Sequence, residues 1–413
     1  MRLRWNINLL MSVLRAIVSV TNDLTTDQRV DRTCITLTEL GYSVILTGRK
    51  LKKSLPLTPR LYEMHRMRLW FNKGPFFYAN YNLRLFFYLL TRKTSLIVSN
   101  DLDTLPASFL AYKIKKLLPL SRGVRPPCDE SRGGYNTRRV RLLHDCHEYF
   151  RGVPELVGRK GPTRAWKWIE DRIFPKLKMV TAVNGSVAKL YEEEYGNEIV
   201  VIRNVPFRKH GGEAISKESL GISPQQKVIL YQGAVNLDRG LEEVIQAMKY
   251  VRSDARLVIV GTGDKFNELQ LFVKQEKVPG KVIFTGPVPF QDLYRYTLMA
   301  DIGLSVEKDV SLNYHFALPN KFLDYIQANV PLLISPFPEM KAILDKYFIG
   351  EVLESHDPKH IAEKIDGMLL NEPRLALYRE NLLPAAEELC WENEAPKLRG
   401  MLEPVASSLR SSQ

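Results

Sequence analysis

The sequence predicts an α/β protein of two doubly wound, Rossmann-like domains that face a central cleft. Its 413 residues are enough for two domains that each bury a core. Short apolar runs that end in a polar residue alternate with helical patterns, which is typical of parallel sheets covered on both faces. A segment rich in Gly, Ser and charge, residues 204–226, separates two such series and is predicted to link them.

We assign residues 1–205 to the first domain. Residues 16–21 (AIVSVT) predict a buried strand, residues 27–40 predict a helix that Gly41 ends, and YSVILTG predicts the next strand. A basic, aromatic stretch follows at residues 50–93. Three more strands are then predicted at SLIVSN, VRLLHD and MVTAVN, each of which leads toward a helical segment.

We assign residues 206–384 to the second domain. Its strand candidates are KVILYQG, ARLVIVG, KVIFTG, DIGLSV and VPLLIS, with amphipathic helices between them, for example at residues 241–251 and 290–300. After about Glu372 the pattern is helical to the end, and Pro384 and Pro396 are expected to break it.

The net charge of +13 is unevenly distributed. Residues 1–200 carry 34 Lys and Arg against 18 Asp and Glu, giving +16, whereas residues 201–413 carry 25 against 28, giving −3. Such asymmetry indicates a polyanionic partner, either nucleic acid or an anionic membrane surface. No apolar run reaches the roughly 18 residues that a membrane span needs, so docking on a membrane surface is the membrane role left open.

The cysteine pattern and the amino-terminal segment favour a cytoplasmic protein. The four cysteines lie far apart, without a CxxC motif or a His/Cys cluster, which disfavours a zinc site and a secreted disulfide framework. The segment MRLRWNINLLMSVLRAIVSV has the basic start and apolar stretch of a signal peptide, but it lacks a small-residue cleavage site and runs into a strand. Peripheral attachment to the inner face of the cytoplasmic membrane stays open.

The first candidate site motif is YQGAVNLDRGLEEVIQA in the second domain. A strand is predicted to end at Gly233, Arg239 lies in the following loop, and Gly240 begins a helix. The guanidinium is a planar fork that can bind two phosphate oxygens at once, next to the free N–H groups of a helix start. An ordinary surface arginine in a loop is the alternative.

The second motif is ALPNKFLDYIQANVPLLIS. Pro319 suits an early helical turn, Asn320 is polar, and Lys321 adds a cation at the cleft edge where Arg239 is expected. Such a pair of cations suits a diphosphate, and the carboxylate of Asp324 suits ribose hydroxyls. Because Lys321 and Asp324 are three residues apart on a helix, they could instead form a simple ion pair.

The third motif is VRLLHDCHEYF in the first domain. Asp145, His147 and Glu148 lie at a predicted strand end, where a histidine beside carboxylates could donate to a substrate hydroxyl. Capping or packing roles for these residues stay open. A metal at HxxH has weak support, and the DxD formed by Asp101 and Asp103 opens a helix, where capping is the favoured interpretation. We therefore expect no metal.

Together these motifs resemble retaining glycosyltransferases of family 4, which have the GT-B fold. ALPNKFLDYIQANVPLLIS, YQGAVNLDRGLEEVIQA, LVIVGTGD and VIFTGPVP are similar to the carboxyl-terminal domain of that family. TNDLTTDQRV, SNDLDTLPA, HDCHEYF and VTAVNGSVAKLY are similar to first-domain loops of its LPNK-type subgroup. The resemblance covers roughly residues 16–400. LCWENEAPKL resembles the terminal helix, about residues 385–413 here, that in such enzymes packs back on the first domain.

The resemblance implies roles for individual residues. Arg239 and Lys321 would hold the diphosphate of a nucleotide sugar, Asp324 would bind the ribose, and the backbone near Val288 would meet the base. His147 would contact the donor sugar near the reacting carbon and is the expected catalytic residue. The expected donor-binding residues are Gly233, Arg239, Val288, Pro319, Asn320, Lys321 and Asp324.

Three departures from the family pattern limit these assignments. Asp324 matches the second acidic position of an ExxxxxxxE pattern, but Phe316 stands at the first. The usual Arg and Lys pair is reduced to Arg239, with Ala234 after Gly233. The glycine-rich turn after the first strand is replaced by NDLTTDQRV. The identity of the sugar therefore cannot be predicted from these motifs.

The function that the resemblance implies is that of a retaining, metal-independent glycosyltransferase of the hexosyltransferase type. It would move a sugar from a nucleotide diphosphate sugar to a glycan or lipid-linked acceptor, in the synthesis of cell-surface polysaccharide or lipopolysaccharide, without a cofactor. One alternative is a nucleotide-sugar epimerase or phosphorylase on the same fold. A basic nucleic-acid-binding protein is a second alternative, although no nucleic-acid-binding motif accompanies the charge.

Overall fold

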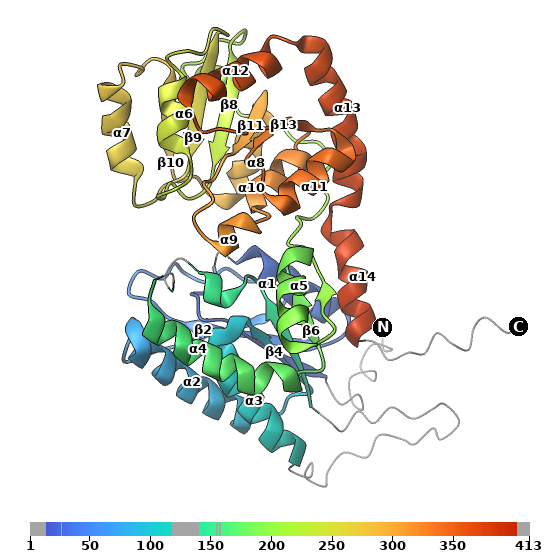
Figure 1. Cartoon of the computed structure of the whole chain (residues 1–413). Coiled ribbons are helices and arrows are strands. Elements are labelled where there is room, and N and C mark those ends of the chain that lie inside the picture. The colour runs from blue at the N-terminus through green and yellow to red at the C-terminus, as the bar shows by residue number, and fades with distance from the viewer. Residues whose placement is uncertain (1–13, 26, 118–139, 154–155, 157, 403–413) are drawn as a thin grey trace, which may run out of the picture. The chain divides into compact units, whose positions relative to one another are not determined.

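The computed structural model describes residues 14–402, apart from residues 26, 118–139, 154–155 and 157 (Figure 1). The chain forms two compact units. The first contains the described residues up to Arg203 and those from Glu394 on, and the second runs from Asn204 to Asn393. Of the helices in the described part, none combines the length and the apolar character needed to cross a bilayer.

The described part of the first unit contains a parallel sheet of seven strands in the order β3-β2-β1-β4-β5-β6-β7. The strands are β1 (Arg15–Ser19), β2 (Ser43–Arg49), β3 (Glu63–Met67), β4 (Leu96–Asn100), β5 (Arg141–Cys146), β6 (Val180–Ala182) and β7 (Val200–Val201). The α-helices are α1 (Gln28–Glu39), α2 (Gly74–Thr91), α3 (Asp101–Leu117), α4 (Lys160–Ile173) and α5 (Gly185–Tyr195).

Local sequence explains where these elements begin and end. The Asp27 side chain accepts a hydrogen bond from the N–H of Val30 and so caps α1. Asn184 caps α5 in the same way, and Gly196, in the left-handed region, ends that helix. Strands β1 and β4 are almost wholly buried because apolar runs fill the centre of the sheet, and the core of the unit forms around them.

The described part of the second unit contains a parallel sheet of six strands in the order β10-β9-β8-β11-β12-β13. They are β8 (Lys227–Gln232), β9 (Ala255–Val260), β10 (Val282–Gly286), β11 (Ile302–Ser305), β12 (Leu332–Ile334) and β13 (Gly350–Val352). The α-helices are α6 (Leu241–Ala247), α7 (Phe266–Gln275), α8 (Phe290–Leu298), α9 (Leu312–His315), α10 (Asn320–Gln327), α11 (Pro338–Tyr347), α12 (Pro358–Leu369) and α13 (Glu372–Glu388).

The strand order fixes where ligands can bind in each sheet. In both sheets the order reverses beside the first strand, between β1 and β4 in one unit and between β8 and β11 in the other. Open parallel sheets bind ligands beyond the carboxyl ends of the strands at this switch point. The loops that follow β8 and β11 therefore form the expected ligand-binding region of the second unit.

Two regions differ from the sequence-based expectation. The basic, aromatic stretch at residues 50–93 contains strand β3 and the long helix α2, for which no elements were predicted. The predicted breaks at Pro384 and Pro396 are wrong, because the two prolines lie inside α13 and α14 (Trp391–Leu402). Burial of the apolar face of α13 offsets the backbone hydrogen bond that Pro384 removes.

The carboxyl-terminal helix divides between the units. The second unit extends past residue 384 to Asn393, and α14 joins the first unit from Glu394 on. There the Arg399 guanidinium pairs with Glu39 at 2.6 Å. Arg141 donates to the backbone carbonyl of Leu402 at 2.7 Å.

Candidate functional site

The loop that carries Arg239 is held against the end of β11. It begins at Gly233, directly after β8, and ends at Gly240, which has a φ of 72° and precedes α6. A Cβ on Gly240 would lie 2.2 Å from the carbonyl oxygen of Val306, so only glycine allows this approach. The backbone thus brings Arg239 beside the residues that follow β11.

A buried carboxylate lies at this point. Glu307 follows β11, and its side chain is 1% exposed. Its Oε1 is 2.6 Å from Nζ of Lys321 and 3.6 Å from Nη1 of Arg239. The Ser305 hydroxyl donates to Oε2 at 3.0 Å. A loop and a helix start that are distant in sequence therefore place their cations against one anion.

Lys321 is more enclosed than a typical helical lysine. It lies in the first turn of α10, its side chain is 8% exposed, and Nζ is 3.9 Å from the ring centroid of Tyr231. Burial tends to raise the pKa of Glu307, but the nearby Lys321 and Arg239 charges outweigh it and lower that pKa below its ordinary value. The three side chains carry a formal net charge of +1, which attracts an anion.

Asp324 lies on the same helix and faces β8. Nε2 of Gln232 donates to its carboxylate at 3.2 Å, and Nζ of Lys209 lies 3.7 Å from it. The three-residue spacing allowed an ion pair between Lys321 and Asp324. In the structure Lys321 instead pairs with Glu307, and Asp324 pairs with Lys209.

The other expected donor-binding residues lie in loops that follow the strands or, for Asn320, at the start of α10. Gly233 is exposed directly after β8, and Val288 is partly buried in the loop after the edge strand β10. Pro319 precedes the first turn of α10 without a side-chain capping bond. Asn320 is exposed and accepts a hydrogen bond from the amide of Asn204 at 2.8 Å.

The first unit holds a separate cluster around His147, which follows β5. Nε2 of His147 lies 3.0 Å from Oδ1 of Asn100 and 3.2 Å from Oδ2 of Asp145. The His147 backbone N–H donates to Asp101 at 2.9 Å. Asp145 is also bound by Arg29, whose Nε and Nη2 donate to it at 2.9 and 2.5 Å. The ring is thus held by carboxylates from two neighbouring strand ends.

This environment sets the charge of the imidazole. Burial disfavours the charged ring, but Asp101 and Asp145 raise the pKa of His147 to about 9. Burial also opposes the charge of Asp145, whose pKa is nevertheless lowered by Arg29 and His147. At neutral pH His147 is therefore an imidazolium, which can donate a hydrogen bond but cannot accept a proton.

The DxD residues contribute to this same cluster. Both lie in the first turn of α3. Asp101 binds His147, whereas Asp103 accepts a hydrogen bond from the Thr21 hydroxyl at 2.6 Å. Burial and the neighbouring Asp101 charge raise the pKa of Asp103 to about 7. In the part of the chain that the structure describes, no group of three or more His, Cys, Asp or Glu side chains has the arrangement of a metal site.

Sequence reasoning missed Glu307 and Arg29. Glu307 stands in LSVEKD, directly after a predicted strand. Its position, a carboxylate at the end of the strand that lies beside β8, was the signal in the sequence that could have identified it. Arg29 stands in TTDQRV, where nothing in the local pattern points to Asp145, which lies 116 residues further along the chain.

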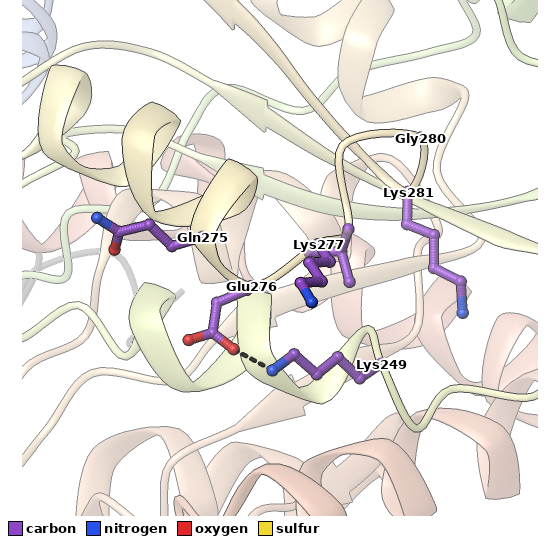
Figure 2. A pocket seen from close by; sticks show the side chains of 7 residues that line it. Lys249, Gln275, Glu276, Lys277, Gly280 and Lys281 are labelled. Carbon is purple, nitrogen blue, oxygen red and sulfur yellow. Dashed lines mark ion pairs between the residues drawn. The ribbon is translucent and has the colours of Figure 1, made fainter.

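A hollow of about 530 Å³ elsewhere in the second unit lacks the chemistry of a donor site (Figure 2). It lies where α6 and α7 end, and two of the three lysines that line it are paired. Lys249 is paired with Glu276, and Nζ of Lys281 donates to the carbonyls of Met248 and Val251 at 2.8 and 3.1 Å. These lysines serve to hold helix ends together.

The sequence of the second unit matches a known family. Residues 213–386 match the family described as Glycosyl transferases group 1. An uncharacterized glycosyltransferase of Methanocaldococcus jannaschii is 27% identical over 186 residues, which cover 43% of this chain and 45% of that protein. A D-inositol 3-phosphate glycosyltransferase of Xylanimonas cellulosilytica is 23% identical over 183 residues, which cover 43% of this chain and 42% of that protein. The match thus spans less than half of each curated relative.

Solved structures resemble most of the chain, across both units. Sucrose-phosphate synthase from Thermosynechococcus elongatus has a TM-score of 0.73 and 13% identity, with 94% of this chain and 98% of that chain covered. HepE of Anabaena in complex with UDP-glucose has a TM-score of 0.70 and 12% identity, with 94% and 99% covered. WaaG, a glycosyltransferase involved in lipopolysaccharide biosynthesis, has a TM-score of 0.64 and 14% identity, with 93% and 98% covered. With the two parallel sheets, these likenesses confirm the predicted GT-B fold.

Proposed function

We propose that this chain, whose second unit matches the glycosyl transferases group 1 family, is a retaining glycosyltransferase that uses a nucleotide diphosphate sugar. The single observation that carries the proposal is the meeting of Arg239 and Lys321 on Glu307 at the β8/β11 switch point. A diphosphate bound there gains two cations. Charge that develops on the leaving diphosphate is then stabilised without a metal ion.

We assign the remaining donor contacts to Asp324, to the backbone near Val288 and to His147. Asp324 binds the ribose, and the backbone near Val288 meets the base. The imidazolium of His147 donates to the donor sugar, a role that its pKa of about 9 supports at neutral pH. Binding of UDP-glucose by HepE supports a nucleotide sugar as the donor.

We further propose family 4 membership, transfer of a hexose and a glycan or lipid-linked acceptor. The likeness to WaaG, a lipopolysaccharide enzyme, supports a place in the synthesis of surface polysaccharide or lipopolysaccharide. Retention with front-face attack requires no catalytic nucleophile from the protein. It requires the donor phosphate to help deprotonate the acceptor hydroxyl.

The first test is a thermal-shift screen of the purified chain with a panel of UDP- and GDP-sugars. A ligand that binds the folded state raises the melting temperature by mass action, so one nucleotide class should stabilise the protein and the other should not. The shift should persist when a chelator is present. If no nucleotide sugar changes the melting temperature, donor binding is refuted.

The second test removes one cation. Arg239→Gln should lower the rate of transfer about a hundredfold, because a charge-assisted contact to the leaving diphosphate is lost. Lys341→Gln is the matched control, since Lys341 lies exposed on α11 and pairs with Asp345 one turn further along the same helix. Equal activity of the two variants would contradict the assignment of Arg239.

The epimerase or phosphorylase alternative is tested with the same donor. An epimerase changes the donor without an acceptor, and a phosphorylase releases its sugar only with phosphate. Product that forms only when an acceptor glycan is added supports transfer.

A further inference from the structure

Helix α2 is apolar on two faces. Phe77, Tyr81, Leu85 and Leu89 form the face that packs into the core of the first unit. Phe76, Leu83 and Phe87 follow a similar helical spacing, yet all three are exposed in the described structure. A surface helix of a globular protein normally carries polar side chains on its outer face, so this outer face indicates a contact with something other than water.

The segment between β3 and α2 extends this apolar surface. Trp70 is 75% exposed, and the neighbouring Phe71 packs against Phe76 with 5.6 Å between ring centroids. The guanidinium of Arg84 lies 4.6 Å from the Trp70 ring centroid. A hollow of about 560 Å³, lined by aromatic and cationic side chains of β3 and α2, opens beside it. We call Trp70, Phe71, Phe76, Leu83, Arg84 and Phe87 the β3–α2 face.

The positive charge around the β3–α2 face indicates the kind of partner that it binds. Residues 50–93 contain ten Lys or Arg and one acidic residue, Glu63. A second copy of this chain would bring the same positive surface and be repelled, whereas an anionic surface would be attracted. Exposed Trp and Phe beside Arg and Lys are the side chains that settle at the headgroup level of a bilayer, where aromatic rings enter the interface and cations meet lipid phosphates.

We propose that the β3–α2 face docks the protein on an anionic phospholipid bilayer. The aromatic side chains enter the interface, and Arg84 and the surrounding cations meet the phosphates. The helix lies on the membrane and does not cross it, in keeping with the absence of a spanning helix among the described residues. This inference does not depend on the donor chemistry proposed above.

Flotation of the full-length chain with lipid vesicles tests the proposal. Vesicles of phosphatidylcholine mixed with phosphatidylglycerol should bind the protein, and vesicles of phosphatidylcholine alone should bind it much less. The double variant Trp70→Ala/Arg84→Gln should lose affinity for the mixed vesicles by about tenfold or more, because one interfacial aromatic and one cation are gone.

A matched variant separates this face from general basic charge. Tyr250 and Lys359 form an exposed aromatic–cation pair in the second unit, with 5.7 Å from Nζ to the ring centroid. Tyr250→Ala/Lys359→Gln removes the same kinds of groups and the same charge, and it should bind vesicles like the unaltered chain. Phe87→Ser, a milder change at an exposed site, should weaken binding as well and covers the case in which the first variant does not fold.

Three results would overturn the proposal. The first is equal binding to both kinds of vesicle. The second is an equal loss of vesicle affinity in the face variant and the matched variant. The third is tight binding of duplex DNA that the face variant loses, without vesicle binding at the same salt concentration, since that result would make nucleic acid the occupant.

Discussion

At the scale of single residues, Glu307 makes Lys321 costly to remove. Without Lys321 the carboxylate stays buried with Arg239 as its remaining cation, 3.6 Å away. Breaking a buried ion pair from one side costs about 3–5 kcal/mol. We expect Lys321→Ala to lower the free energy of unfolding of the second unit by that amount, as measured by denaturant unfolding, in addition to any loss of activity.

The double variant Lys321→Met/Glu307→Gln checks this explanation. It removes both charges and keeps similar volumes, so it should recover most of the lost stability. Lys341→Ala, at an exposed pair within α11, should change the unfolding free energy by less than about 0.5 kcal/mol. A double variant as unstable as Lys321→Ala would mean that the unpaired charge of buried Glu307 is not the cause of the loss.

The residues of the site were only partly predictable from the sequence. Arg239, Lys321 and Asp324 stand in motifs whose loops follow predicted strands, so their gathering at one sheet edge could be expected. Glu307 also follows a predicted strand, but that position alone does not single it out. Its contacts depend on β11 lying beside β8, and that strand order is set by packing between distant segments, not by local spacing.

At the scale of elements, the turn between β8 and α6 depends on Gly240. An alanine there would combine a φ of 72° with a Cβ 2.2 Å from the Val306 carbonyl oxygen. We expect Gly240→Ala to lower the free energy of unfolding by about 2 kcal/mol or more and to weaken nucleotide-sugar binding, because the loop that holds Arg239 must move. Denaturant unfolding and ligand thermal shift measure the two effects.

Gly367→Ala is the control for this change. Gly367 lies exposed within α12, has no strained φ, and a Cβ there meets nothing within 4 Å. Alanine should leave stability unchanged or raise it by up to about 1 kcal/mol. If Gly240→Ala behaves like Gly367→Ala, the backbone approach to Val306 is not what fixes the loop.

The elements that could be predicted from the sequence are those with a clear hydrophobic pattern. Buried strands such as β1, β4 and β8 appear as short apolar runs with polar ends. Helix α2 lacks the amphipathic period because its outer face is also apolar, and β3 carries His65 and Arg66 within the strand. Propensity rules failed at Pro384 because tertiary packing of α13 outweighs one missing hydrogen bond.

At the scale of the whole molecule, the His147 cluster makes stability depend on pH. Asp101 and Asp145 raise the pKa of His147 from an ordinary value near 6.5 to about 9. A raised histidine pKa stabilises the folded state fully below about pH 6.5, and this contribution is lost as pH rises to about 9. The raised pKa of Asp103, about 7, also lowers stability as pH rises, but over the range from about 4 to 7, because the fold favours the protonated acid.

We therefore expect the first unit to unfold at a lower temperature as pH rises from about 6.5 to 9, with a loss on the order of 3 kcal/mol from His147. Calorimetry across this range measures it. Asp145 has a lowered pKa, so its stabilisation disappears only when pH falls below the ordinary aspartate range near 4. His147→Gln should be less stable at pH 6 and should flatten the decline above pH 6.5. A variant that keeps the full decline would show that His147 is not the titrating group.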